Sequence, residues 1–84
     1  MKNKKICVVG LGYIGFPTAT LFAHNGYLVH GVEKSPTIVD CLNNGNIHID
    51  EPGLHEIALR ALELKRLIVS DKPCPADVYI ICVP

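Results

Sequence analysis

The sequence predicts an α/β domain built on a parallel sheet, and three observations support that fold class. Apolar segments of strand length alternate with segments of helical periodicity along the 84 residues. The first apolar segment, residues 5–9, lacks polar alternation, as expected for a strand that is covered on both faces. Between this strand and the first helical segment lies a glycine-rich turn, Gly10-Leu11-Gly12-Tyr13-Ile14-Gly15.

The first half of the chain is expected to form a strand, a helix and a second strand. After the strand at 5–9, the helix runs from about residue 12 to residue 25, with Pro17 near its start, where a missing N–H costs little. Gly26 ends this helix because glycine readily takes the left-handed cap. The second strand covers residues 27–33. The expected apolar face of the helix contains Ile14, Leu21 and Phe22.

The second half adds two helices and two strands. Ser35-Pro36 predicts the N-cap and first position of a short helix. A third helix runs from about residue 52 to residue 65, and Asp50-Glu51 are expected to cap it rather than to act in catalysis. Apolar runs at 67–69 and 78–83 predict the last two strands.

Alternating strands and helices imply right-handed crossovers and a parallel sheet of about four strands. We expect the spatial order 3-2-1-4 of a partial Rossmann fold, the doubly wound parallel sheet. A complete Rossmann domain needs about six strands. Residues 1–84 are therefore expected to be the N-terminal part of a dinucleotide-binding domain and a fragment of a longer chain.

Charge and composition exclude several classes of function. Eight Lys and Arg balance eight Asp and Glu, so no basic field favours nucleic acid. The apolar runs are far shorter than the ~20 residues of a membrane helix. The four cysteines form no Cys-x-x-Cys pair and the four histidines are scattered, which predicts neither a disulfide framework nor a metal site. We therefore expect a cytoplasmic protein with no nucleic-acid or membrane partner.

Strand, glycine turn and helix, in this order, form the context that a dinucleotide fingerprint needs. Gly10 allows a tight exit from the strand, Gly12 lets the backbone approach a pyrophosphate, and Gly15 lets the helix pack on the strand. The unpaired N–H groups and positive dipole end of the helix would then face the phosphates. Glu33 follows Gly15 by eighteen residues, close to the expected acid at the end of the second strand. A glycine-rich turn without a ligand is the alternative.

The carboxylate of Glu33 would accept hydrogen bonds from the ribose hydroxyls and repel a 2′-phosphate, which favours NAD over NADP. Lys34 leaves the alternative open, because a cation there could serve a 2′-phosphate. Tyr13 could present its backbone N–H to the pyrophosphate or act as an apolar rim residue. His48 and His55 lack an evident partner, and no catalytic constellation is visible. The expected cofactor-binding residues are Gly10, Gly12, Tyr13, Ile14, Gly15 and Glu33.

These residues resemble the opening of the UDP-sugar 6-dehydrogenases, and the similarity covers essentially the whole chain. The stretches Gly12-Tyr13-Ile14-Gly15-Phe16-Pro17-Thr18-Ala19 and His48-Ile49-Asp50-Glu51-Pro52-Gly53-Leu54 resemble most closely the UDP-N-acetylmannosamine dehydrogenase branch. Further matching stretches are Ile6–Leu11, Gly31–Glu33, Leu42–Gly45, Ala76-Asp77 and Val83-Pro84. Two positions depart from the usual pattern: Phe16 replaces a leucine, and Glu33 replaces an aspartate.

The resemblance implies an NAD-dependent enzyme that oxidises the C6 hydroxymethyl group of a UDP-sugar to a carboxylate through a thioester on a catalytic cysteine. The substrate would be UDP-N-acetylmannosamine or a related UDP-sugar, which implies a role in nucleotide-sugar metabolism and polysaccharide biosynthesis. The family's catalytic cysteine, lysine and asparagine lie beyond this chain, so no catalytic residue is expected within it. A homo-oligomer is expected. The alternative is a stand-alone, non-catalytic dinucleotide-binding module; the second motif disfavours a hydroxyacid or acyl-CoA dehydrogenase.

Overall fold

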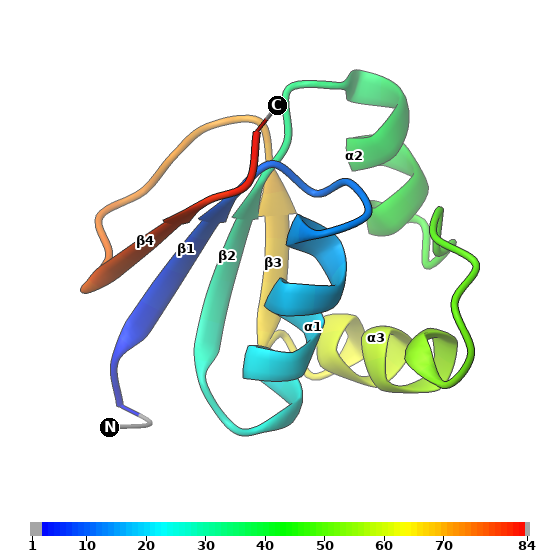
Figure 1. Ribbon diagram of the computed structural model, residues 1–84, viewed down its shortest axis with the longest axis horizontal. Helices are drawn as coiled ribbons and strands as arrows, with labels where there is room; N and C mark the ends of the chain where they lie inside the picture. Colours follow the sequence, from blue (N-terminus) through cyan, green and yellow to red (C-terminus); the bar gives the residue numbers. More distant parts are fainter. Residues whose placement is uncertain (1–2, 84) are drawn as a thin grey trace.

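The computed structural model describes residues 3–83, and its centre is a sheet of four parallel strands (Figure 1). The order across the sheet is β3-β2-β1-β4, and every neighbouring pair is parallel. The predicted fold class and the order 3-2-1-4 are therefore confirmed. The last strand ends two residues earlier than predicted, and Pro84 lies outside the described residues. The strands are β1 (Lys5–Val9), β2 (Leu28–Val32), β3 (Leu67–Ser70) and β4 (Val78–Ile81).

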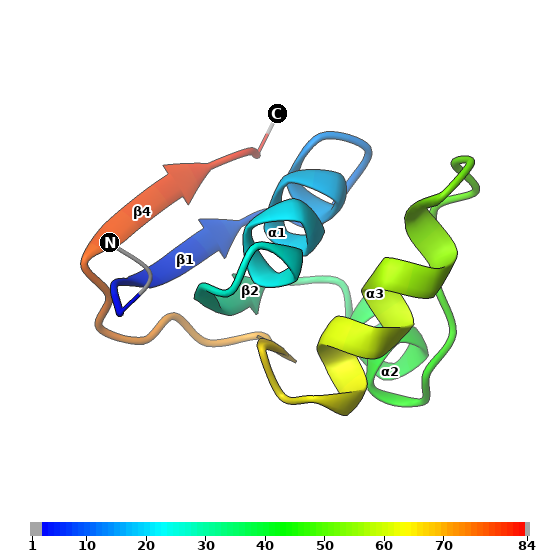
Figure 2. The same cartoon turned by 90° about the horizontal axis from the view of Figure 1, so that it is seen from below.

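Three helices pack against one face of this sheet (Figures 1 and 2). They are α1 (Gly15–His24), α2 (Pro36–Asn43) and α3 (Leu54–Glu63). Across residues 3–83, no helix is both long enough and apolar enough to cross a membrane. The buried apolar side chains between sheet and helices are Ile6, Val8, Leu11, Phe16, Ala19, Ala23, Val29, Leu42, Ile49, Leu54, Ala58, Ala61, Leu67 and Val69.

The buried face of α1 differs from the predicted one. Ile14 and Leu21 were expected in the core, but they are 72% and 53% exposed. The helix instead buries Phe16 and the small side chains of Ala19 and Ala23. Small residues let the helix axis approach the sheet closely, so the phase of the helix follows its small side chains rather than its large aliphatic ones. The helix also begins at Gly15, three residues later than predicted.

The start of α3 does not depend on the carboxylates that precede it. Asp50-Glu51 were expected to cap this helix, but its N-cap is Gly53 and no side chain caps it. Gly53 has a φ of 81°, so a left-handed residue turns the chain into the helix. The backbone N–H of Leu54 instead donates to the carbonyl oxygen of Glu51, 3.1 Å away. The capping prediction was therefore wrong, because backbone geometry at Gly53 replaces side-chain capping.

The end of α3 has an unusual residue in a common cap. Lys65 has a φ of 61° and is the sole non-glycine residue with positive φ within 3–83. Its N–H donates to Leu62, and the N–H of Arg66 donates to Ala61, at 3.2 and 3.0 Å. These two bonds form a Schellman cap, in which glycine is the usual left-handed residue. The lysine therefore holds a conformation that its Cβ disfavours.

The sheet face opposite the helices carries no helix within residues 3–83 (Figure 2). Cys7 lies on this face, and it is fully buried because the connection from β3 to β4 passes over it at Cys74. The burial raises the pKa of the Cys7 thiol, although a hydrogen bond with the Cys74 backbone opposes the rise. The connection leaves other parts of this face open, and Tyr79 and Ile81 on β4 are 51% and 63% exposed.

We predict that the purified 84-residue chain self-associates through residues 78–83 or folds only marginally. Strand β4 lies at the sheet edge, so one side of it presents unpaired N–H and C=O groups beside exposed apolar side chains. Sedimentation velocity should show species larger than a monomer. The control variant Ile81→Lys places a charge on the edge and should shift any assembly toward monomer. A well-folded wild-type monomer would contradict the prediction.

Candidate functional site

The glycine turn leaves the sheet at the carboxyl end of β1 through a residue that only glycine suits. Gly10 has a φ of +96°, and its N–H donates to the carbonyl oxygen of Val32 at 2.8 Å. A Cβ on Gly10 would lie 2.8 Å from the backbone oxygen of Cys82, just beyond β4. The turn is therefore held between the ends of β2 and β4, which flank β1.

Gly15 and Gly12 lack a side chain for different reasons. A Cβ on Gly15 would overlap the carbonyl oxygen of Gly10, so the first turn of α1 packs directly on the turn that precedes it. At Gly12 a Cβ would meet nothing within 4 Å, because this part of the turn faces open space. The fold thus requires glycine at position 15, whereas Gly12 leaves room for another molecule.

The N-terminus of α1 is left open for an acceptor. Its N-cap, Ile14, makes no side-chain capping bond, and the first turn holds no acid. Within residues 3–83, the backbone N–H groups of residues 12–15 have no intramolecular acceptor. Helix α2 differs, because the side chain of Ser35 caps the N–H of Ile38. Unpaired N–H groups at a helix N-terminus attract anions.

Glu33 follows β2 and braces the turn from the side. One carboxylate oxygen accepts from the N–H of Leu11 at 2.9 Å, and the other accepts from the N–H of Ser35 at 3.0 Å. A carboxylate offers about four acceptor positions, so each oxygen retains capacity for another donor. Glu33 therefore has a structural role that the sequence did not predict, and it keeps the capacity to accept from a ligand.

The hydrogen bonds to Glu33 also set its charge state. Partial burial raises the pKa of Glu33, whereas the hydrogen bonds from the two backbone N–H groups lower it. The fields of His48 and Lys34 lower it further, and the pKa lies below the ordinary value of 4.5. The stabilisation from this carboxylate is therefore fully present above pH 4.5 and is lost only as the pH falls through the lowered pKa.

His48 has partners that sequence reasoning missed. Its Nε2 atom lies 2.6 Å from the carbonyl oxygen of Leu11, and because a carbonyl only accepts, Nε2 is the donor. The ring of Phe16 packs against the imidazole in an edge arrangement, with centroids 5.0 Å apart. A backbone carbonyl distant in the sequence gives no pattern to search for. The resemblance around residues 48–54 was the one signal that marked this loop.

Part of the glycine turn and Glu33 border a hollow of about 790 Å³ at the carboxyl edge of the sheet. Gly10, Glu33 and Val83 all line it, so the expected meeting of three distant stretches at one edge is observed; Pro84 lies outside the described residues. Tyr13 and Ile14 stand at its rim, 84% and 72% exposed. The lining residues are Val9, Gly10, Gly12, Tyr13, Ile14, Val32, Glu33, Lys34, Ile38, Ile81, Cys82 and Val83.

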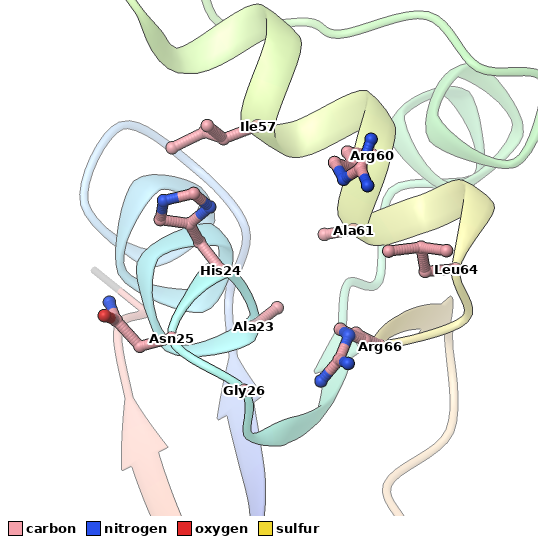
Figure 3. Close-up of a pocket in the computed structure, with 9 residues that line it drawn as sticks. All are labelled: Ala23, His24, Asn25, Gly26, Ile57, Arg60, Ala61, Leu64 and Arg66. Atoms are coloured by element: carbon pink, nitrogen blue, oxygen red, sulfur yellow. The ribbon is translucent and has the colours of Figure 1, made fainter.

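A second hollow, of about 450 Å³, lies between α1 and α3 (Figure 3). Arg60, Arg66 and His24 line it, beside the end of α1 where the helix presents carbonyl oxygens. None of the residues expected to bind the cofactor lines this second hollow within residues 3–83. Nor does any group of three or more His, Cys, Asp or Glu in that range suit a metal ion.

Comparison with known proteins identifies the family. Residues 4–84 match the NAD binding domain of the UDP-glucose/GDP-mannose dehydrogenase family. The chain belongs to this family. A UDP-N-acetyl-D-mannosamine dehydrogenase of Methanococcus vannielii is 51% identical over 99% of the chain, which spans 19% of that protein. NAD is therefore the cofactor of this domain, and the membership does not favour the stand-alone binding module.

Solved dehydrogenases share the fold. The UDP-N-acetyl-mannosamine dehydrogenase of Staphylococcus aureus matches 95% of the chain with 49% identity and a TM-score of 0.92, and the chain covers 19% of it. The GDP-mannose dehydrogenase of Pseudomonas aeruginosa, solved as a ternary complex, matches the whole chain with 33% identity and a TM-score of 0.88. The chain covers 20% of the latter. The NAD-binding sheet and helices are thus preserved across relatives named for different sugars.

We predict that Gly12→Val abolishes detectable NAD binding while the domain stays folded. The added methyl groups enter open space in the free protein, but they would occupy the side from which a pyrophosphate is expected to approach. Gly15→Ala is the matched control, because its Cβ would overlap Gly10 and should lower the melting temperature. Calorimetry and thermal unfolding measure both effects. Unchanged NAD affinity in folded Gly12→Val would contradict this prediction.

Proposed function

We propose that this chain forms the adenosine and pyrophosphate half of the NAD site in a UDP-sugar 6-dehydrogenase. The observation that carries the proposal is the open N-terminus of α1, where unpaired N–H groups and the open side of Gly12 border the same hollow as Glu33. This arrangement offers donors to a diphosphate and an acceptor to sugar hydroxyls. The hollow is also large enough for a nucleotide.

Each expected cofactor residue has a distinct task in this proposal. Gly10 and Gly15 shape the turn, whereas the N–H groups of Gly12, Tyr13 and Ile14 would donate to the pyrophosphate. Glu33, ionised at neutral pH, would accept from the ribose hydroxyls with its remaining lone pairs. When bound, NAD supplies the hydride acceptor for oxidation of the substrate.

The proposed substrate of the whole protein is UDP-N-acetylmannosamine, whose C6 hydroxymethyl group would be oxidised to a carboxylate. Relatives at 46–51% identity carry the name UDP-N-acetyl-D-mannosamine dehydrogenase in both Methanococcus vannielii and Salmonella typhi. A Ralstonia relative at 44% identity is named for an NDP-N-acetyl-D-galactosaminuronic acid, so a related sugar is the second candidate.

Catalytic residues would lie outside this chain. Residues 3–83 contain free cysteines, which suits the proposed cytoplasmic location, and a homo-oligomer stays a prediction.

The choice between NAD and NADP depends on two neighbouring charges at the end of β2. Glu33 lines the hollow as a carboxylate, and Lys34 lines it as an exposed cation. Both carboxylate oxygens of Glu33 are held by backbone N–H groups, so the negative charge is fixed in place. No intramolecular bond fixes the Lys34 side chain among the described residues. A 2′-phosphate would therefore meet a fixed negative charge beside a less constrained positive one, which favours NAD.

We expect the intact wild-type protein to reduce NAD when UDP-N-acetylmannosamine is added, and to do so faster than with UDP-glucose. Nicotinamide absorbance measures the rate, and product analysis should show two NADH formed per carboxylate. A variant of this domain with Gly12→Val supplies the inactive control, because it keeps the fold while blocking the pyrophosphate. Rapid turnover of UDP-glucose with none of UDP-N-acetylmannosamine would reject the proposed sugar.

The wild-type protein should bind NAD more tightly than NADP, and Glu33→Gln should narrow the gap by about tenfold, or ~1.4 kcal/mol. Glutamine removes the charge and retains one acceptor for the N–H of Leu11. Lys34→Ala is the control: it should leave NAD affinity nearly unchanged and weaken any residual NADP binding. Titration calorimetry measures the affinities of all three proteins for both cofactors. Tighter binding of NADP than NAD by the wild type would overturn the assignment.

A further inference from the structure

The loop between α2 and α3 brings His48 to the inner side of the glycine turn. Ile49, the next residue, is 7% exposed in the core, and Leu54 at the start of α3 is 4% exposed. These two buried side chains anchor the second half of the loop to the core. The imidazole then lies between the ring of Phe16 and the carbonyl of Leu11. The position of the imidazole is therefore fixed by contacts within the protein.

In Leu11, the backbone N–H, the backbone carbonyl and the side chain are all held by contacts with the rest of the protein. Its N–H donates to Glu33, its carbonyl accepts from His48, and its side chain is fully buried. A Cβ on Gly31 would come within 2.9 Å of the Leu11 side chain, so that glycine makes the space the leucine fills. In residues 3–83, His48 is the sole donor to the Leu11 carbonyl.

The bond from His48 has a consequence on the far side of the same peptide group. The carbonyl of Leu11 and the N–H of Gly12 belong to one planar trans unit, and they point in opposite directions. A carbonyl held toward His48 therefore directs the Gly12 N–H away from the core and toward the open side of the turn. The same bond also occupies the carbonyl that Gly15 would reach in a regular helical turn, and the Gly15 N–H stays unpaired.

We propose that His48 is a positioning residue for the dinucleotide phosphates, acting through the peptide group of Leu11 and Gly12. This role rests on the proposed NAD site. A donor on the carbonyl side polarises the peptide group and strengthens its N–H as a donor to the pyrophosphate. The other ring nitrogen, Nδ1, is buried without a partner in the described residues. The imidazole thus leaves one polar atom unsatisfied while its Nε2 holds the turn.

The test compares two substitutions in the intact protein. His48→Phe keeps an aromatic ring against Phe16 but removes the donor, whereas His48→Gln retains an N–H donor. We expect His48→Phe to weaken NAD and ADP binding by about tenfold, the scale of one lost hydrogen bond to a ligand-binding group. His48→Gln should recover most of that loss. The affinity for adenosine, which lacks phosphates, should change less than about twofold on the same scale.

His55→Phe is the matched control, because His55 is an exposed histidine on α3 that does not line the hollow beside Glu33. It should leave all three ligand affinities unchanged. A melting temperature measured without ligand separates lost folding from lost binding. A folded His48→Phe protein that binds NAD as the wild type does would overturn the positioning role alone. Loss of adenosine and ADP binding in equal proportion would overturn it too, because the phosphates would then not be the affected group.

A measurement on the wild type covers the case in which His48→Phe fails to fold. Nitrogen-detected imidazole spectra should show the proton of His48 on Nε2, and saturating NAD should shift that resonance together with the Gly12 amide. A His48 signal that is protonated on Nδ1 alone, or that does not respond to bound NAD, would overturn the role. A wild type that binds neither NAD nor ADP would instead overturn the proposed function, and this role with it.

Discussion

The contact between the start of α1 and the carbonyl of Gly10 leaves no room for a single side-chain carbon, and the rest of the structure depends on it. The contact requires glycine at position 15 and draws the helix toward the sheet, where Ala19 and Ala23 continue the close packing. It also places the open end of the helix directly at the carboxyl edge of β1. The contact thus sets the position of the whole surface that is proposed to bind the pyrophosphate.

The two sides of the turn have opposite properties. On the inner side, Leu11 is bonded through both its N–H and its carbonyl and is buried in the core. On the outer side, Gly12 meets no neighbour and Tyr13 is largely exposed. A rigid inner side with an open outer side is a preorganised site, because the protein orders the donors during folding rather than at the moment of binding. The packing of the core offsets the entropy that is lost when these donors are ordered.

Most of the fold followed from local patterns, whereas parts of the site did not. Glycine spacing and apolar runs predicted the strand order and the meeting of Gly10 with Glu33, because both depend on chain direction and handedness. The exposed position of Leu21 was missed, since hydrophobicity alone does not reveal how closely a helix approaches its sheet. The bond from His48 to Leu11 was invisible for another reason: its acceptor is a backbone carbonyl, which every residue has.

The space beside Gly31 links two positions that are twenty residues apart in the chain. A Cβ at 31 would come within 2.9 Å of the end of the Leu11 side chain, so that side chain would have to shift within the turn that Glu33 and His48 hold. A smaller residue at 11 would leave space for a side chain at 31. The two positions are therefore expected to co-vary during evolution, although neither residue lines the hollow beside Glu33.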